Sequence, residues 1–265
     1  MSEHILMDVQ DNIATITFNR PESRNALSQE MREGLMDFTA QAGLDPKIRC
    51  VVLRGAAGNF MAGGDIKGFQ ARQSLPPEER KALILKGIHG LHFAIYRMRQ
   101  MPKPVLASVA GAAAGAGVSL VAACDLAIAA DDSFFILAYA NIGLSPDASS
   151  TYFLPRIMGM KRVAELTFLP ERFDAETALN YGLINRVVPA AELEAETDKL
   201  AQRLANGPTV AYGHAKALLE SSLNTSLETQ LELEGHAIAE CMVTEDHAEG
   251  VTAFLEKRSP QFKGR

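Results

Sequence analysis

The chain has 265 residues, of which 47% are hydrophobic and 22% are charged, and its formal net charge is -6. This length is enough for one large domain with a sizeable core, and the hydrophobic content excludes a disordered chain. The acidic balance argues against a nucleic-acid partner, which would need clustered positive charge.

The cysteines and the apolar stretches indicate the cellular setting. Cys50, Cys124 and Cys241 are widely spaced and have apolar neighbours, which favours reduced thiols over a disulfide framework or a zinc site. No apolar stretch reaches membrane-spanning length, and the first residues lack a basic segment followed by a long apolar core. We therefore expect a soluble cytoplasmic protein with no membrane contact.

Strand and helix patterns alternate through the first half of the chain. Two β-prone runs, His4–Val9 and Ile13–Phe18, flank a polar turn and predict a hairpin. Ser28 can cap a helix that ends at Gly43, and Ile48–Leu53 follows as a strand. The alternation continues with a helix over residues 78–99, the strand Val105–Val109, a small-residue helix through Ala123 and the apolar run Leu126–Ala129. This order is typical of an α/β domain.

Helical patterns dominate beyond about residue 190. The predicted helices are Ala191–Ala205, Thr209–Ser222, Leu227–Met242 and Asp246–Arg258. We therefore divide the chain into an α/β core, residues 1–190, and a helical C-terminal region, residues 191–265. The apolar positions of these helices do not decide whether the region packs on its own core or on a neighbouring subunit.

Two turns rich in glycine and alanine, Phe60–Ile66 and Gly111–Gly117, each follow a predicted buried strand. Small residues let a ligand approach the main-chain N–H groups closely. Two converging N–H donors can hold an oxygen that becomes negatively charged during a reaction, as in an oxyanion hole. Either turn taken alone is also typical of an ordinary tight turn.

Other motifs give weaker signals. The run from Gly115 lacks the third glycine of a dinucleotide-binding pattern, because Leu120 stands in its place. Ser119 lacks the second glycine of a nucleophile elbow and is better interpreted as a buried helix hydroxyl. His89 and His92 share a helix face without a third ligand nearby in the sequence, so we expect no metal site.

Six parts of the chain share their residues and their order with one protein family. They are Asn19–Pro21 with Asn25–Leu27, Phe60–Ile66, Pro102–Pro104, Gly111–Asp125, Gly143–Asp147, and Gly250–Phe254 with Lys257 and Arg258. Together they resemble the enoyl-CoA hydratase/isomerase (crotonase) superfamily over nearly the whole chain. Residues 143–155 and 249–264 are most similar to its branch of enoyl-CoA isomerases and ring-1,2-epoxyphenylacetyl-CoA isomerases.

The resemblance implies a fold, a substrate and an assembly. The fold would be a crotonase-like spiral of β-β-α turns followed by a helical trimerisation region, giving a homotrimer or a dimer of trimers. The substrate would be a coenzyme A thioester whose carbonyl oxygen lies between the backbone N–H groups of Gly64 and Ala116. Coenzyme A would be part of the substrate, with no separate cofactor. Glycine and alanine suit this role because the backbone is the donor and a larger side chain would crowd the thioester.

The same resemblance implies contacts with coenzyme A. Residues 62–66 would run beside the adenine, Arg24 and Lys67 would face the phosphates, and Phe254 and Lys257 would meet the ligand, in some members within an adjacent subunit. The implied contacts are Arg24, Ala62, Asp65, Ile66, Lys67, Phe254 and Lys257. Solvated surface charges, a core phenylalanine and a cation at a helix end are the ordinary alternatives.

The acid/base residues distinguish isomerases from hydratases in this family. Where hydratases carry two glutamates, this chain has Ser119 and Tyr139, and neither is an anionic base at neutral pH without a large pKa shift. Asp147 falls where isomerases carry a carboxylate that removes a proton and returns it further along the acyl chain. Alternatively, Asp147 could cap a helix over residues 148–159. Tyr139 would donate a hydrogen bond or shape the acyl pocket.

An isomerase with Asp147 as the proton shuttle is therefore the predicted function. A hydratase, thioesterase or decarboxylase of the same fold is an alternative, because all of these stabilise an enolate or an oxyanion. An acyl-CoA-binding protein without catalytic activity is the alternative from another class.

Overall fold

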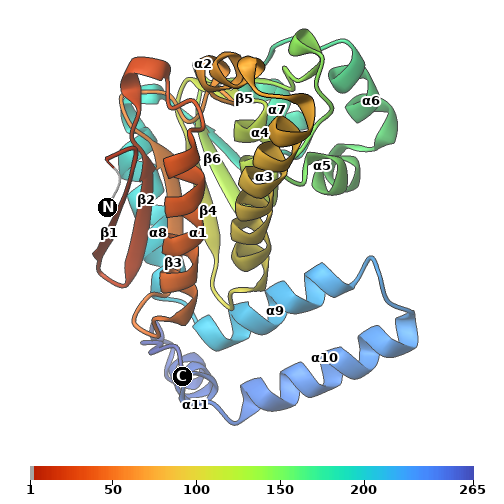
Figure 1. Ribbon diagram of the computed structural model, residues 1–265. Coiled ribbons are helices and arrows are strands. Elements are labelled where there is room, and N and C mark those ends of the chain that lie inside the picture. Colours follow the sequence, from red (N-terminus) through yellow and green to blue (C-terminus); the bar gives the residue numbers. More distant parts are fainter. Residues whose placement is uncertain (1–2) are drawn as a thin grey trace.

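The computed structural model describes residues 3–265 and has a six-stranded sheet at its centre (Figure 1). The strand order is β1-β2-β3-β4-β6-β9, with β1 antiparallel to β2 and every later pair parallel. The strands are β1 (Ile5–Gln10), β2 (Ile13–Phe18), β3 (Cys50–Gly55), β4 (Val105–Val109), β6 (Leu126–Ala130) and β9 (Arg186–Val188). The predicted hairpin and the predicted strands are confirmed within one or two residues.

Alternate residues of the central strands face two separate hydrophobic cores. Val51 and Leu53 of β3 belong to the larger core, whereas Cys50 and Val52 belong to a smaller one that includes Leu200 of α8. This alternation follows from the two-residue period of a strand whose two faces are both covered. The helices of the first face are α1 (Gln29–Leu44) and α3 (Pro77–Gln100), and α8 (Leu193–Ala205) covers the second (Figure 1).

Local signals explain where α1 begins. The side chain of Ser28 accepts a hydrogen bond from the Met31 amide at 3.1 Å, as the sequence predicts for an N-cap. Met31, Leu35 and Ala42 then recur at helical spacing and are fully buried, and α1 packs along α3.

Shorter elements surround the ends of the central strands. A second sheet has the order β5-β7-β8, with β5 inside the second glycine turn. Its strands are β5 (Ala112–Ala114), β7 (Phe134–Ile136) and β8 (Phe173–Asp174). The nearby helices are α2 (Ile66–Ala71), α4 (Ala116–Ala123), α5 (Ser150–Met158), α6 (Met160–Phe168) and α7 (Ala175–Asn180), at the top of Figure 1. The 3₁₀ turns are η1 (Pro21–Ser23), η2 (Arg72–Ser74), η3 (Ala140–Ile142) and η4 (Ala190–Glu192).

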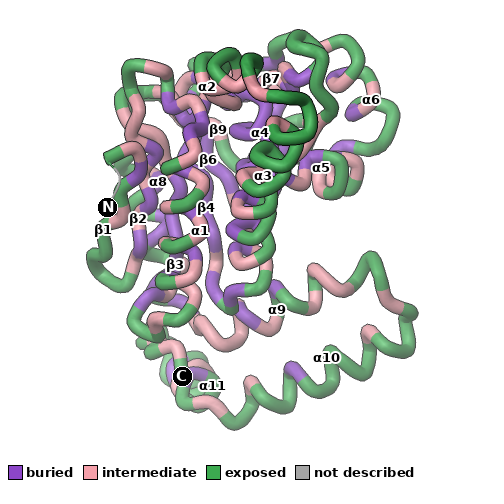
Figure 2. Tube along the Cα trace, in the orientation of Figure 1, coloured by how far each residue is buried: buried purple, intermediate pink, exposed green. Residues whose placement is uncertain are grey.

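The last helices form an arm at the opposite end of the molecule, shown in blue in Figure 1. They are α9 (Thr209–Ser221), α10 (Leu227–Met242) and α11 (Glu245–Glu256), close to the predicted ranges. Figure 2 shows that α10 is exposed along most of its length. The α8 helix packs on the sheet, and a domain boundary at residue 190 stays a prediction.

Buried ionic contacts join the arm to the core. Lys216 of α9 is buried and its ammonium lies 2.7 Å from Asp125, which also pairs with Arg99 of α3 at 2.9 Å. Burial lowers the pKa of Lys216, and the charge of Asp125 acts in the opposite direction. At the chain end, the Arg49 guanidinium donates to the Phe262 carbonyl at 3.1 Å. These contacts hold α9 and the last residues in place.

No helix among residues 3–265 is long and apolar enough to cross a membrane.

Candidate active site

The two glycine turns run side by side. The Met61 amide donates to the Ala112 carbonyl at 2.9 Å, and the Ala114 amide donates to the Met61 carbonyl at 2.8 Å. A Cβ placed on Gly117 would lie 2.8 Å from the Met61 carbonyl oxygen, which is too close for a real side chain. The pairing of these turns therefore requires a small residue at this position.

Gly64 and Ala116 follow glycines in unusual backbone conformations. Gly63 has φ 92° and Gly115 has φ 49°, and each glycine redirects the chain just before the residue of interest. Ala116 is the first residue of α4, so its N–H has no carbonyl partner within the helix. Neither the Gly64 nor the Ala116 amide makes a hydrogen bond to any residue of the described chain, 3–265. Both donors are available to an oxygen atom of a ligand.

A chain of three polar side chains adjoins the second turn. The Tyr139 hydroxyl donates to Asp147 Oδ1 at 2.7 Å and lies 3.1 Å from the Ser119 hydroxyl. A Cβ on Gly115 would lie 3.8 Å from Tyr139 Cζ, so the tyrosine ring is next to the glycine turn. This arrangement links the candidate carboxylate to the backbone donors through one aromatic ring.

Tyr139 and Ser119 are buried, with exposed fractions of 8% and 0%. Burial raises the pKa of the Tyr139 phenol far above its usual range, and the negative charge of Asp147 raises it further. The phenol therefore stays protonated and acts as a donor to Asp147. Ser119 also donates to the Asp147 carbonyl at 3.3 Å, which confirms its interpretation as a buried helix hydroxyl.

The interpretation of Asp147 as a helix cap is wrong. Helix α5 begins at Ser150, and its N-cap position is Ser149, at φ 69° and without a side-chain cap bond. Ala148 also has a positive φ, 51°, so two left-handed residues separate Asp147 from the helix. Its carboxyl group turns to Tyr139 instead. Non-glycine residues in this conformation cost about 1–3 kcal/mol each and cluster at functional sites.

Five of the residues implied as coenzyme A contacts lie near the first glycine turn. Ala62 donates through its amide to the Arg24 carbonyl at 3.0 Å, which joins the two segments. Ile66 is 55% exposed, and the exposed side chains of Arg24 and Lys67 make no ion pair with residues 3–265. Asp65 caps α2 by accepting from the Gly68 amide at 3.2 Å.

Phe254 and Lys257 lie far from these residues within one chain. Both belong to the α11 end of the arm, whereas α2 lies at the opposite end of the molecule (Figure 1). Phe254 is 83% exposed, so the alternative of a core anchor is wrong. Lys257 is the C-cap of α11 with φ 57°. A contact of these two residues with coenzyme A would need the ligand of another subunit.

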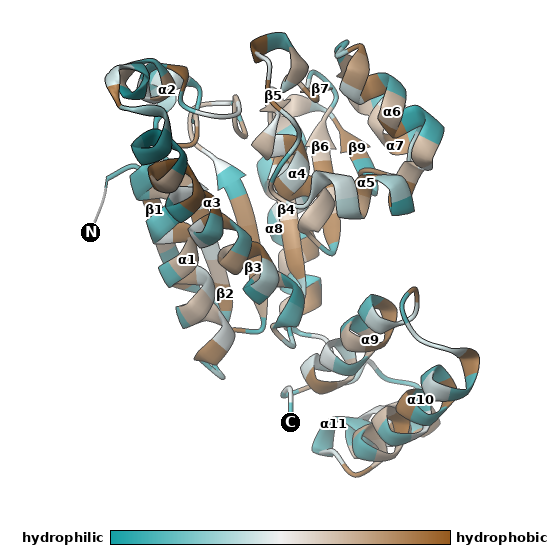
Figure 3. Cartoon of the chain, turned by 45° about the vertical axis from the view of Figure 1, so that its right-hand side comes forward, coloured by the Kyte–Doolittle hydropathy of each residue, from teal (hydrophilic) through white to brown (hydrophobic). Residues whose placement is uncertain are grey.

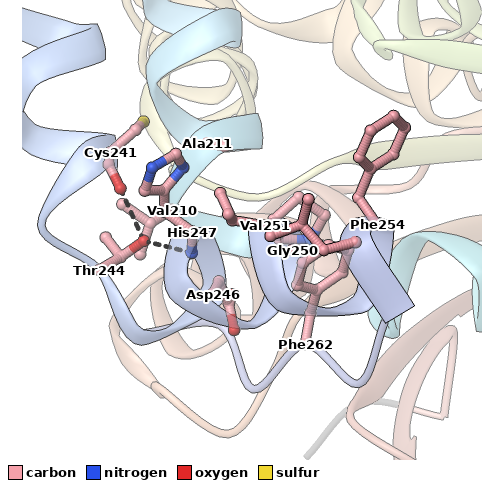
Figure 4. Close-up of a pocket in the computed structure, with 12 residues that line it drawn as sticks. Val210, Ala211, Cys241, Thr244, Asp246, His247, Gly250, Val251, Phe254 and Phe262 are labelled. Atoms are coloured by element: carbon pink, nitrogen blue, oxygen red, sulfur yellow. Dashed lines mark hydrogen bonds between the residues drawn. The ribbon is translucent and has the colours of Figure 1, made fainter. Parts of the chain in front are cut away.

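Phe254 lines a cavity of about 480 Å³ between the helices of the arm (Figure 4). The other walls include Val210 of α9, Cys241 of α10 and Phe262 of the last segment. This cavity is mostly apolar and lies in the arm, away from Asp147 and the glycine turns. It therefore belongs to the surface of the arm and not to the candidate site.

Two residues near the site are absent from the sequence predictions. A Cβ on Gly64 would lie 2.7 Å from Phe69 Cζ, so the Phe69 ring packs against the Cα of Gly64. Phe69 lies one turn into the helix that Asp65 caps, and this position in the sequence could have indicated its contact with Gly64. Arg20 forms an ion pair with Asp65 at 3.2 Å. The two residues are far apart in the chain, so no local sequence pattern predicts this pair. Among residues 3–265 no three histidine, cysteine, aspartate or glutamate side chains gather in a way that could hold a metal ion.

Comparison with known proteins identifies the family of this chain. The family model described as enoyl-CoA hydratase/isomerase matches residues 8–265. The chain belongs to this family. A member from Escherichia coli (strain K12), 1,2-epoxyphenylacetyl-CoA isomerase, is 37% identical over 265 residues and the match covers all of both chains. A probable enoyl-CoA hydratase from Rhodobacter capsulatus is 39% identical over 266 residues, again across the full length of both.

A solved structure named as an enoyl-CoA hydratase has the same fold as this chain. The crystal structure of an enoyl-CoA hydratase from Polaromonas sp. JS666 superposes with a TM-score of 0.92 at 34% identity, covering 98% of this chain and 99% of that one. The predicted crotonase-like α/β fold with a helical C-terminal region is thus confirmed. A coenzyme A thioester substrate and hydratase/isomerase chemistry follow from the family, and its members carry both names.

Proposed function

We propose that this protein is an acyl-CoA isomerase that shifts a double bond, or opens a ring epoxide, through an enolate. The observation that carries the proposal is the hydrogen bond from the Tyr139 hydroxyl to Asp147, because the Tyr139 ring lies next to the second glycine turn. The amides of Gly64 and Ala116 in the two turns make no hydrogen bond within residues 3–265. One carboxylate is enough to remove a proton and return it elsewhere on the same substrate.

The backbone amides would stabilise the charge that develops on the thioester. Removal of a proton from C2 sends its electron pair toward the carbonyl, so the oxygen becomes an enolate oxygen. In our proposal the Gly64 and Ala116 amides donate to this oxygen. Ala116 also opens helix α4, whose N-terminal end favours negative charge. Removing one such donor from an enzyme costs about 100- to 1000-fold in rate.

Asp147 would move the proton. With a 3-enoyl-CoA, its carboxylate would take a proton from C2 and return it to C4, while the double bond moves from C3–C4 to C2–C3. The carboxylate is regenerated, so atoms and charge balance without a co-reactant. The Tyr139 hydroxyl would hold Asp147 Oδ1 and leave the other carboxylate oxygen for the proton.

A hydratase is the second candidate, because the relative from Rhodobacter capsulatus bears that name. Hydration needs a group to activate water and a group to protonate C2, and two carboxylates usually share this work in the family. Here Ser119 and Tyr139 stand at those positions, and the raised pKa of Tyr139 makes it a poor base. The proposal therefore favours the isomerase.

Paired assays distinguish the candidates. An isomerase converts hex-3-enoyl-CoA to its 2-enoyl isomer and leaves crotonyl-CoA without added water, whereas a hydratase consumes crotonyl-CoA. Incorporation of deuterium at C2 in heavy water would exclude an acyl-CoA-binding protein without catalytic activity. Consumption of crotonyl-CoA alone would overturn the isomerase.

We further propose a homotrimer or a dimer of trimers, built through the arm. Apolar residues at helical spacing share one exposed face of α10, visible as brown segments in Figure 3. They are Leu227, Leu231, Ile238 and Met242. In such an assembly, Phe254 and Lys257 of one subunit could reach coenzyme A bound to the next.

We propose a cytoplasmic location and no cofactor other than coenzyme A, which is part of the substrate. The state of the cysteines supports the location. Cys50 and Cys124 are buried free thiols, and burial raises the pKa of Cys50 to about 12 and that of Cys124 further still. Free thiols in place of disulfides are typical of proteins in a reducing compartment.

A further inference from the structure

The hydroxyl group of Ser119 lies between the two halves of the candidate site. Its oxygen is 3.3 Å from the Gly115 carbonyl, 3.1 Å from the Tyr139 hydroxyl and 3.3 Å from the main-chain carbonyl of Asp147. The serine is fully buried, so these protein oxygens are the partners of its hydroxyl. They belong to two separate segments, the second glycine turn and the stretch between β7 and α5.

The first contact of Ser119 concerns the backbone donor at Ala116. The Gly115 carbonyl and the Ala116 N–H belong to the same peptide unit, and in a planar trans peptide these two groups point in opposite directions. Because the carbonyl accepts from the amide and the hydroxyl of Ser119, the Ala116 N–H points away from the serine. A donor on the carbonyl also polarises the peptide and makes its N–H a stronger donor.

The second contact concerns the main chain of Asp147. Its carbonyl accepts from the Ser119 hydroxyl at 3.3 Å and from the Ser150 hydroxyl at 2.9 Å, and both serines are buried. The next two residues, Ala148 and Ser149, have the positive φ angles 51° and 69°. Such conformations persist only where the surroundings fix them. The two buried hydroxyls provide this support, and they thereby fix the direction of the Asp147 carboxyl group.

The third contact links Ser119 to the side chain of Asp147 through Tyr139. The phenol donates its proton to Asp147 Oδ1, so its oxygen is left to accept from Ser119. Hydrogen bonds in a chain polarise one another, and this donation strengthens the bond from Tyr139 to the carboxylate. A serine inside a helix often bonds to the carbonyl four residues back. The contacts with Tyr139 and Asp147 distinguish Ser119 from that ordinary case.

We propose that Ser119 is a positioning residue that holds the Ala116 amide and the Asp147 carboxylate in a fixed geometry relative to each other, a role that rests on the proposed function. In that function the amide binds the thioester oxygen and the carboxylate removes a proton from C2. The carbonyl carbon and C2 are bonded neighbours, so both protein groups must be correctly placed at the same time. A misplacement of about 1 Å can cost about 100-fold in rate.

Steady-state kinetics with hex-3-enoyl-CoA test this role in Ser119→Ala. We expect kcat to fall by about 10- to 100-fold with little change in KM, because the lost alignment matters in the transition state and not in binding. Ser108→Ala is the matched control. Ser108 is also buried, and its hydroxyl lies 2.7 Å from Thr197 Oγ1 of α8, on the other face of the sheet. Both variants should lower the melting temperature by about 2–4 °C, and the control should keep the wild-type kcat.

Infrared spectroscopy tests the same role without turnover. The ligand is hexanoyl-CoA with ¹³C at the thioester carbonyl, which has no double bond to move. Hydrogen bonds to a carbonyl oxygen weaken the C=O bond, so binding to the wild type and to Ser108→Ala should lower its stretching frequency. Ser119→Ala should lose part of this lowering, because its Ala116 amide is less polarised and less firmly held.

The outcomes separate the role of Ser119 from the proposed function. A wild-type kcat in Ser119→Ala, an equal loss in Ser108→Ala, or a carbonyl band that stays at the wild-type frequency overturns the positioning role. Failure of the wild type to isomerise hex-3-enoyl-CoA overturns the proposed function alone, and the carbonyl band still tests the link between Ser119 and the amide. If Ser119→Ala does not fold, Ser119→Cys has a similar shape and a weak donor, and it provides the same comparison.

Discussion

Replacement of Asp147 by asparagine should nearly abolish isomerase turnover while leaving the fold intact. Asparagine has almost the same volume, and its carbonyl oxygen can still accept from the Tyr139 hydroxyl, which lies 2.7 Å from Oδ1. The bond changes from charge-assisted to neutral, which costs about 1 kcal/mol of unfolding free energy and lowers the melting temperature by about 2–4 °C. The proton shuttle is lost entirely, so kcat should fall by about 100- to 10,000-fold.

The measurement is the rate of hex-3-enoyl-CoA isomerisation, together with deuterium exchange at C2 followed by NMR. Asp174→Asn is the matched control. Asp174 caps α7 from an exposed position, and asparagine is an equally good cap, so both rate and stability should be unchanged. Wild-type turnover and exchange by the Asp147→Asn variant would remove this carboxylate from the mechanism. A loss of turnover that tracks unfolding would show a structural role only.

Further changes test other parts of the molecule. Tyr139→Phe removes the donor to the candidate carboxylate and should lower kcat by about 10- to 150-fold; an unchanged rate and substrate range would leave the ring as packing alone. Leu231→Glu puts a charge on the apolar face of α10, so sedimentation should show smaller species than the wild type; a monomeric wild type would refute assembly through the arm. The Arg258 guanidinium lowers the pKa of Glu249 from 4.5 to about 2, so this pair stabilises the fold above pH 4.5 and the contribution is lost as the pH falls toward 2. Urea unfolding should therefore show a larger effect of Glu249→Gln at pH 7 than at pH 3, and an equal effect at both would contradict the assignment.

Long elements with a clear hydrophobic period could be predicted from sequence alone. The helix after Ser28 and the strands that precede the glycine turns appear where their patterns place them, because cap and period are local properties. The sequence patterns do not predict the short strands β5, β7 and β8 or the helices α2, α6 and α7. Elements of two to nine residues show too few periods for a pattern, and contacts between distant segments stabilise them.

In the candidate site, the sequence alone identifies the small residues Gly64 and Ala116 and the carboxylate of Asp147. It also shows serine and tyrosine, at positions 119 and 139, where hydratases carry two glutamates. Residue types are given by the sequence itself and do not depend on how the chain folds. The tertiary structure decided the partner of Asp147, because the positive φ angles at Ala148 and Ser149 turn its carboxyl group away from α5 and toward Tyr139. It also decided that Arg20 pairs with Asp65, because these residues lie far apart in the chain and meet only where their segments pack together.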